Sequence, residues 1–116
     1  AGFSQGAALS VYAGYTYSKK LAGIFAISGW PPLADELVEA LRSGANRDTP
    51  ALIEHGAHDQ VVLPECGART AELIRASGTP VTAELAYPVA HGPHPAGLEL
   101  LGTFVAEHLG GGCVES

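Results

Sequence analysis

Residues 22–28 read Ala-Gly-Ile-Phe-Ala-Ile-Ser, a short apolar run without a charged side chain. A run of this length and composition predicts a strand that is buried on both faces, as in a parallel sheet. Residues 50–55 and 81–87 form two further runs of similar length, each bounded by proline or glycine. We therefore predict three short strands that lie in one sheet.

Helices are predicted between and around these strands, because apolar residues recur three and four positions apart. The four predicted helices cover residues 5–18, 33–42, 64–76 and 96–109. Lys19 and Lys20 are expected to end the first helix, where cations interact favourably with the helix dipole. Alternating helices and strands imply an α/β fold, with a parallel sheet covered by helices on both faces. We expect one domain over residues 1–109 and a flexible tail over 110–116.

The composition argues against several classes of protein. The chain has 116 residues, a formal net charge of −6 and only six lysines and arginines, which disfavours nucleic acid as a partner. Its apolar stretches are much shorter than the ~20 residues of a transmembrane segment, and no signal peptide is recognisable. Cys66 and Cys113 form no C-x-x-C pair, so neither a thiolate metal site nor a disulfide framework is expected. We therefore expect a cytoplasmic protein.

The segment Gly2-Phe3-Ser4-Gln5-Gly6 fits the pattern G-x-S-x-G. This pattern forms a sharp turn from a strand into a helix, and the turn exposes the serine hydroxyl. A glycine is expected on each side because the strained turn leaves no room for a side chain. The backbone N–H of Gln5 lies at the start of the following helix, where it suits a developing oxyanion. Ser4 is therefore the candidate nucleophile.

A serine hydroxyl becomes an effective nucleophile only with a base, which in turn needs an orienting acid. These groups should follow later strands, because ligand sites gather at the carboxyl ends of parallel strands. Asp59 follows the second predicted strand and His91 follows the third. The order Ser, Asp, His is also the one expected after this type of turn. We therefore predict Ser4 as nucleophile, Asp59 as orienting acid and His91 as general base.

Other acids and histidines compete for these roles. Asp35 lies in a predicted helix, and Asp48 precedes a strand at the opposite end of the sheet. His94 shares the loop of the proposed base and is its rival on these grounds. His55 ends a strand and is more typical of a core or supporting histidine, whereas His108 lies on the last helix, where exposure is expected.

The histidines also raise the question of a metal site. His55 and His58, like His91 and His94, are three residues apart and could supply imidazole ligands. Neither pair fits the H-E-x-x-H pattern of metalloproteases. No metal ligands are therefore predicted.

Four segments carry a family resemblance. They read Gly-Phe-Ser-Gln-Gly-Ala-Ala-Leu-Ser at 2–10, Leu-Ala-Gly-Ile at 21–24 continuing to Ser-Gly-Trp at 28–30, His-Gly-Ala-His-Asp-Gln-Val-Val at 55–62, and Tyr-Pro-Val-Ala-His-Gly at 87–92. In this order they resemble the nucleophile region, the next strand with its turn, the acid loop and the histidine loop of the acyl-protein thioesterase and carboxylesterase family, also called the phospholipase/carboxylesterase family. The resemblance covers nearly the whole chain.

This resemblance implies the C-terminal portion of an α/β-hydrolase that works through an acyl-enzyme intermediate. It assigns Ser4, Asp59 and His91 to a catalytic triad, and so favours His91 over His94. It also implies a substrate-binding position for Trp30 beside the acyl site, although this side chain suits the core equally well. Substrates would be carboxylic esters or thioesters, in small molecules or S-acylated proteins, and no cofactor would be needed.

Three features separate this chain from the family pattern. The histidine loop carries two prolines and a second histidine, Pro93-His94-Pro95. The proline that usually follows the acid comes one residue later, as Leu63-Pro64. The sequence also starts directly at the nucleophile motif, so the earlier strands and the loop that gives a second oxyanion donor are expected upstream of Ala1. We therefore expect residues 1–116 alone to be inactive. The alternative to an enzyme is a non-catalytic hydrolase relic that acts as a binding module.

Overall fold

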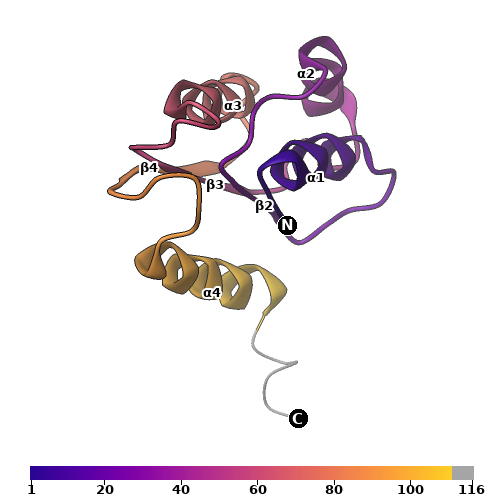
Figure 1. Ribbon diagram of the computed structural model, residues 1–116. Helices are drawn as coiled ribbons and strands as arrows, with labels where there is room; N and C mark the ends of the chain where they lie inside the picture. Colours follow the sequence, from indigo (N-terminus) through magenta and orange to yellow (C-terminus); the bar gives the residue numbers. More distant parts are fainter. Residues whose placement is uncertain (111–116) are drawn as a thin grey trace.

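The computed structural model describes residues 1–110, so most of the predicted tail, at 111–116, lies outside the described residues. Helices and strands alternate along the chain (Figure 1). The elements are β1 (Gly2–Phe3), α1 (Gln5–Thr16), β2 (Ile24–Ile27), α2 (Ala34–Ser43), β3 (Ala51–Gly56), α3 (Pro64–Ala76), β4 (Val81–Tyr87) and α4 (Pro95–Leu109). The four strands are parallel and lie in the order β1-β2-β3-β4. The predicted α/β fold with a parallel sheet is confirmed.

The sheet carries helices on both faces. Figure 1 shows α1, α2 and α3 on one face and α4 on the other. β2 and β3 are buried along their whole length, as their apolar runs predicted. β4 is only partly buried because it forms an edge of the sheet. Each strand connects to the next through a helix, so the carboxyl ends of all four strands lie at the same end of the sheet.

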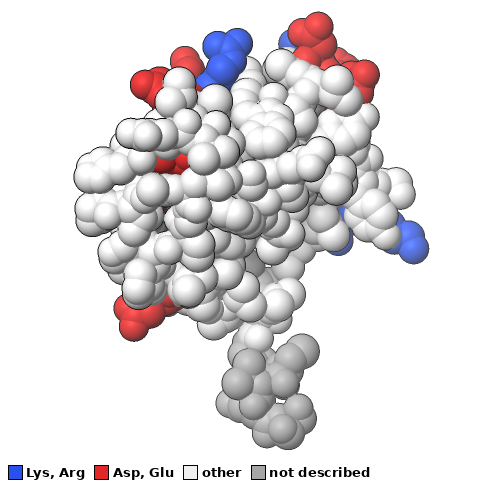
Figure 2. Space-filling view, in the orientation of Figure 1, with Lys and Arg blue, Asp and Glu red and all other residues white. Residues whose placement is uncertain are grey.

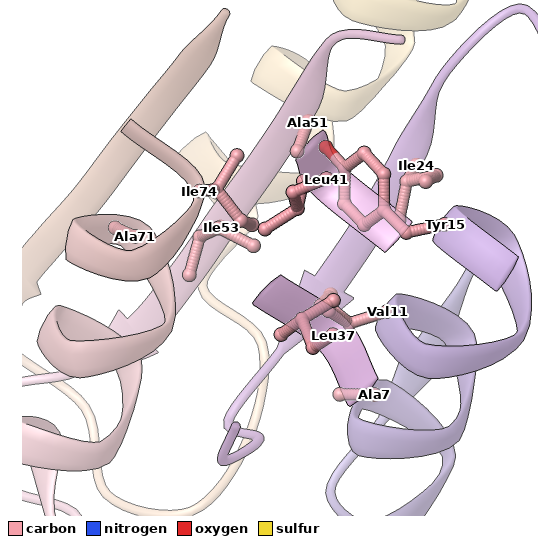
Figure 3. Close-up of a cluster of buried hydrophobic side chains, with 11 residues drawn as sticks. Ala7, Val11, Tyr15, Ile24, Leu37, Leu41, Ala51, Ile53, Ala71 and Ile74 are labelled. Carbon is pink, nitrogen blue, oxygen red and sulfur yellow. The ribbon is translucent and has the colours of Figure 1, made fainter. Parts of the chain in front are cut away.

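The larger hydrophobic core lies between the sheet and the helices α1, α2 and α3 (Figure 3). Its buried side chains are Ala7, Val11, Tyr15, Ile24, Ala26, Leu37, Leu41, Ala51, Ile53, Ala71 and Ile74. The hydroxyl of Tyr15 donates a hydrogen bond to the Thr49 carbonyl at 3.0 Å. The second cluster, between the sheet and α4, consists of Phe25, Ile27, Leu52 and Phe104. Strand residues thus alternate between the two clusters, as the two-residue period of a strand requires.

The end of α1 differs from the prediction. The helix ends at Thr16 and has no basic residue in its last turn, so the expectation that Lys19 and Lys20 close it is wrong. The side-chain amide of the buried Asn46 donates hydrogen bonds to the carbonyls of Tyr17, at 3.1 Å, and Lys19, at 2.8 Å. The chain beyond Thr16 therefore binds a buried amide instead of continuing the helix.

Charged side chains lie mainly at the periphery of the face shown in Figure 2, and the middle of this face is largely uncharged. Among residues 1–110, none of the helices combines the length and the apolar content of a bilayer-spanning segment.

Candidate active site

Ser4 lies on the turn between β1 and α1. Its backbone has φ 56° and ψ −120°, a region that residues with side chains rarely adopt. The Ser4 N–H donates a hydrogen bond of 2.8 Å to the Ile27 carbonyl, which ties the turn to β2. The two-residue β1 pairs with β2 just before this turn, so the strand–turn–helix context of the motif is present.

The two glycines of the motif differ in what they allow. A Cβ atom on Gly2 would overlap with the Gly6 carbonyl, so only glycine fits there. A Cβ atom on Gly6 would meet no atom within 4 Å among the described residues. The prediction that the turn leaves no room at either glycine is therefore correct for Gly2 and wrong for Gly6, whose Cα faces open space.

Ser4, His91 and Asp59 form one row of hydrogen bonds. His91 Nε2 lies 3.0 Å from Ser4 Oγ, and His91 Nδ1 lies 2.7 Å from Asp59 Oδ2. Because the carboxylate can only accept, Nδ1 carries the proton and the Nε2 lone pair faces the serine hydroxyl. In this arrangement the imidazole can take the hydroxyl proton. The Asp59 side chain is completely buried, whereas the His91 side chain is 19% exposed.

Both oxygens of the Asp59 carboxylate are engaged. Oδ1 accepts hydrogen bonds from the backbone N–H groups of Val61 and Val62, each at 2.9 Å, and Oδ2 accepts from His91. Burial pushes the pKa of Asp59 upward, but the hydrogen bonds from His91 and the two N–H groups outweigh burial, and the pKa lies below its ordinary value. Asp59 is therefore ionised at neutral pH and can stabilise an imidazolium.

Contacts between the loops fix the spacing of this row. The Ala57 N–H, in the acid loop, donates to the Tyr87 carbonyl at 2.8 Å, where the histidine loop begins. The Phe3 ring lies against the His91 ring, with their centroids 4.9 Å apart. Sequence reasoning missed both contacts, because Phe3 occupies a variable position of the motif and backbone partners leave no mark in a sequence.

Two further residues had predicted roles at this site. Gln5 is the first residue of α1, so its N–H has no acceptor within the helix. No acidic side chain lies in the first turn of α1, so the positive end of the helix dipole is available beside Ser4. Trp30 is half-buried and lies with Ala7 and Gly67 around a small cavity between α1 and α3. Trp30 therefore packs near α1 and α3. Contact of Trp30 with a substrate stays a prediction.

The rival candidates lie outside the hydrogen-bonded row. Asp35 is exposed in the first turn of α2, and Asp48 is exposed before β3. His94 is the N-cap of α4, where its Nδ1 accepts a backbone N–H at 3.1 Å and its ring stacks on Tyr87. His108 is exposed on α4. His91, and not His94, is therefore the histidine of this loop that contacts Ser4.

His55 also belongs to this region, although it does not bind the serine. It is buried, and its Nε2 lies 3.3 Å from Asp59 Oδ2 and 2.7 Å from the Val62 carbonyl. This position fits the interpretation of a core or supporting histidine. His58 is exposed, and within residues 1–110 no three His, Cys, Asp or Glu side chains are grouped to hold a metal ion.

Comparison with known proteins gives consistent matches in sequence. A model of the phospholipase/carboxylesterase family matches residues 1–109. The chain is 35% identical over 109 residues to acyl-protein thioesterase 1 of Gibberella zeae. It is 34% identical over 109 residues to acyl-protein thioesterase 1 homolog 1 of Dictyostelium discoideum. Both matches cover 93% of the chain but 46% and 47% of the relatives, so the chain spans about half of their length.

A solved structure extends the comparison to the fold. The crystal structure of Arabidopsis thaliana SOBER1 matches with a TM-score of 0.83 at 29% sequence identity, over 94% of this chain and 51% of SOBER1. The architecture is thus the one that α/β-hydrolases share. Because the family match covers nearly every residue and the fold agrees with it, the chain belongs to the phospholipase/carboxylesterase family.

Proposed function

We propose that this chain carries the catalytic groups of a serine hydrolase that cleaves carboxylic esters or thioesters. The observation that carries the proposal is the row of hydrogen bonds from Ser4 Oγ through His91 to Asp59, at 3.0 and 2.7 Å. Each member matches a role in acyl transfer: a hydroxyl that attacks, a base that takes its proton and a carboxylate that orients the base. Because the chain spans about half the length of its relatives, the activity is proposed for the complete protein that carries this sequence.

In the acylation step, Ser4 Oγ attacks the carbonyl carbon of the substrate while His91 Nε2 accepts the hydroxyl proton. The carbonyl oxygen becomes an oxyanion, which the free N–H of Gln5 at the start of α1 stabilises. When this tetrahedral intermediate collapses, the C–O or C–S bond breaks and His91 gives its proton to the leaving alcohol or thiol. The acyl group remains as an ester of Ser4.

In the deacylation step, water attacks the acyl-enzyme and His91 takes the proton of the water. The second tetrahedral intermediate releases the carboxylic acid and returns the proton to Ser4 Oγ. Asp59 stays ionised throughout, because the backbone N–H groups of Val61 and Val62 and the imidazole N–H all bind its carboxylate. The residues of the chain supply every proton transfer in this cycle.

Apolar side chains around the serine-bearing end of the sheet favour an apolar acyl group. Phe3, Leu33, Val61 and Leu63 are each at least 44% exposed. Phe3 directly precedes the nucleophile, and Val61 and Leu63 closely follow the acid. The relatives are named acyl-protein thioesterases, which supports an S-acylated protein or a small-molecule ester as the substrate.

Replacing the serine tests this proposal. Ser4→Ala in the complete protein should abolish hydrolysis of a p-nitrophenyl ester and of an S-acylated peptide, with the melting temperature nearly unchanged, because loss of the nucleophile leaves only weak residual catalysis. His91→Ala should be equally damaging, whereas His94→Ala, a matched control in the same loop, should be mild. Near-normal turnover by Ser4→Ala would contradict the proposal, whereas a folded wild-type protein without turnover would favour a binding module. An inactive His94→Ala beside an active His91→Ala would reassign the base.

We further propose that residues 1–116 alone are inactive. The Gln5 N–H supplies one oxyanion donor, and loss of a second donor costs about 10²–10³ in rate. The strained turn at Ser4 is held by a strand of only two residues. Expression of residues 1–116 beside the complete protein tests this point. A cooperative unfolding transition together with comparable ester turnover would contradict it.

A further inference from the structure

His55, near the end of β3, lies against the loop that carries Asp59. Its side chain is completely buried. The Nε2 atom lies 2.7 Å from the Val62 carbonyl and 3.3 Å from Asp59 Oδ2. Val62 is also bound through its N–H, which donates to Asp59 Oδ1 at 2.9 Å. One residue of the acid loop is thus held between the side chains of His55 and Asp59.

These contacts settle which nitrogen of His55 carries a proton. A backbone carbonyl can only accept, so the proton is on Nε2. Nδ1 is then an acceptor, and it is buried without a hydrogen-bond partner among the described residues. Gly67 of α3 lies directly against this nitrogen, since a Cβ atom at that position would be 2.6 Å from Nδ1. Helix α3 therefore supports the ring on one side while the ring donates its N–H to the acid loop on the other.

We propose that His55 is a positioning residue, whose Nε2–H holds Val62 so that Asp59 presents Oδ2 to His91. The proposal rests on the serine-hydrolase function proposed above and adds a residue that acts through Asp59. Without the imidazole donor, the Val62 carbonyl loses its partner and the loop rearranges to recover one. Movement of the Val62 N–H then removes one of the two backbone hydrogen bonds to Asp59 Oδ1. A carboxylate held by fewer donors rotates, and its hydrogen bond to His91 Nδ1 lengthens.

The effect should fall on the chemical step and not on substrate binding, because His55 is buried behind Asp59. Misplacement of a catalytic group by about 1 Å can cost roughly 10²-fold in rate. His55→Leu keeps an apolar body but removes the N–H, and it should lower kcat by about 10²-fold with KM unchanged. His55→Gln can place an amide N–H close to the position of Nε2, and it should restore most of kcat.

The experiment uses the complete protein, with kcat expressed per active site titrated by a fluorophosphonate, so that unfolded molecules do not count. Leu52→Ala is the matched control, because Leu52 is buried in the same strand but packs towards α4. It should lower the melting temperature and keep kcat per titrated site. Gly67→Ala displaces the His55 ring from the other side and should reproduce the loss seen in His55→Leu.

Proton NMR of the His91 Nδ1–H gives a second readout, because a proton held between imidazole and carboxylate resonates at low field. This resonance should be present in the wild type, His55→Gln and Leu52→Ala, and shifted or lost in His55→Leu. A His55→Leu protein with wild-type kcat per titrated site and an unchanged resonance overturns the proposal, as does an equal fall of kcat in Leu52→Ala. If the wild type is neither labelled nor active, the serine-hydrolase function fails, and the resonance still decides whether His55 holds the Asp59–His91 bond.

Discussion

Two buried carboxyls lie five residues apart, Glu54 within β3 and Asp59 in the loop after it, and their surroundings are opposite. Their exposed fractions are 1% and 2%. Asp59 accepts three hydrogen bonds, and its pKa lies below the ordinary value. Neither oxygen of Glu54 has a hydrogen-bond partner among the described residues. Burial, and then the charge of Glu84, raise the pKa of Glu54 to about 7.

The difference follows from where each residue lies along the chain. Glu54 is inside a central strand, where backbone N–H groups are committed to neighbouring strands, and Glu84 stands opposite it on β4. Its carboxyl lies against Gly97 in the first turn of α4, where a Cβ atom would overlap with it. Asp59 lies just beyond the carboxyl end of β3, where a loop offers free N–H groups. Donors therefore decide whether a buried carboxyl is charged, and loops at strand ends supply them.

Activity should show the largest contrast between the two carboxyls. Asp59→Asn removes the charge that orients and stabilises the imidazole, so kcat of the complete protein should fall by about 10⁴-fold. Glu54→Gln should leave kcat nearly unchanged, because Glu54 contacts no member of the hydrogen-bonded row. Ester turnover per folded molecule measures both. An inactive Glu54→Gln beside an active Asp59→Asn would show that the wrong carboxyl has been assigned.

The second largest contrast between Glu54 and Asp59 should be in the stability of the folded protein at high pH. The pKa of Glu54 in the folded protein, about 7, exceeds its ordinary value of 4.5, so ionisation is easier in the unfolded chain. Ionisation of Glu54 therefore lowers the free energy of unfolding. This loss of stability is absent below about pH 4.5, grows as pH rises to about 7 and is constant above that. Glu54→Gln should therefore be more stable than the wild type by about 3 kcal/mol at pH 9 and equal to it at pH 4. Denaturant unfolding measures this, and an equal difference at both pH values would contradict it.

Ionisation of Asp59 should change the stability of the folded protein less than ionisation of Glu54, and in the opposite direction. Its pKa in the folded protein is lowered, so its stabilising contribution is present above the ordinary value near 4 and is lost as pH falls through the folded value. The stability gap between the wild type and Asp59→Asn should therefore narrow as pH falls from 6 to 3. The same unfolding titrations measure it. A gap that stays constant over this range would mean that the hydrogen bonds to Asp59 are weak in solution.

The fold was predictable where burial leaves a compositional mark. β2 and β3 are covered on both faces, so each is an apolar run in the sequence, and helices with one buried face show a period of three to four. The end of α1 was not predictable, because the segment after the helix is bound by the Asn46 amide, which lies 27 and 29 residues away in sequence from the carbonyls that it contacts. The burial of Glu54 was not predictable either, since no local sequence pattern indicates a buried carboxyl without hydrogen-bond partners.

The candidate site was predictable in its side chains and not in its backbone. Ser4, Asp59 and His91 were picked out because each follows a strand at the same end of a parallel sheet. The N–H groups of Val61 and Val62 that bind Asp59 depend on the path of the loop, and every residue except proline carries such a donor.

The proposed mechanism requires that the Ser4 hydroxyl is a nucleophile activated by His91 and Asp59. The most direct test treats the complete protein with a fluorophosphonate and locates the adduct by peptide mass spectrometry. A single adduct is expected, on Ser4, and it should fail to form in His91→Ala. A folded wild-type protein that gives no adduct, or an adduct on another serine, would show that Ser4 is not the activated nucleophile.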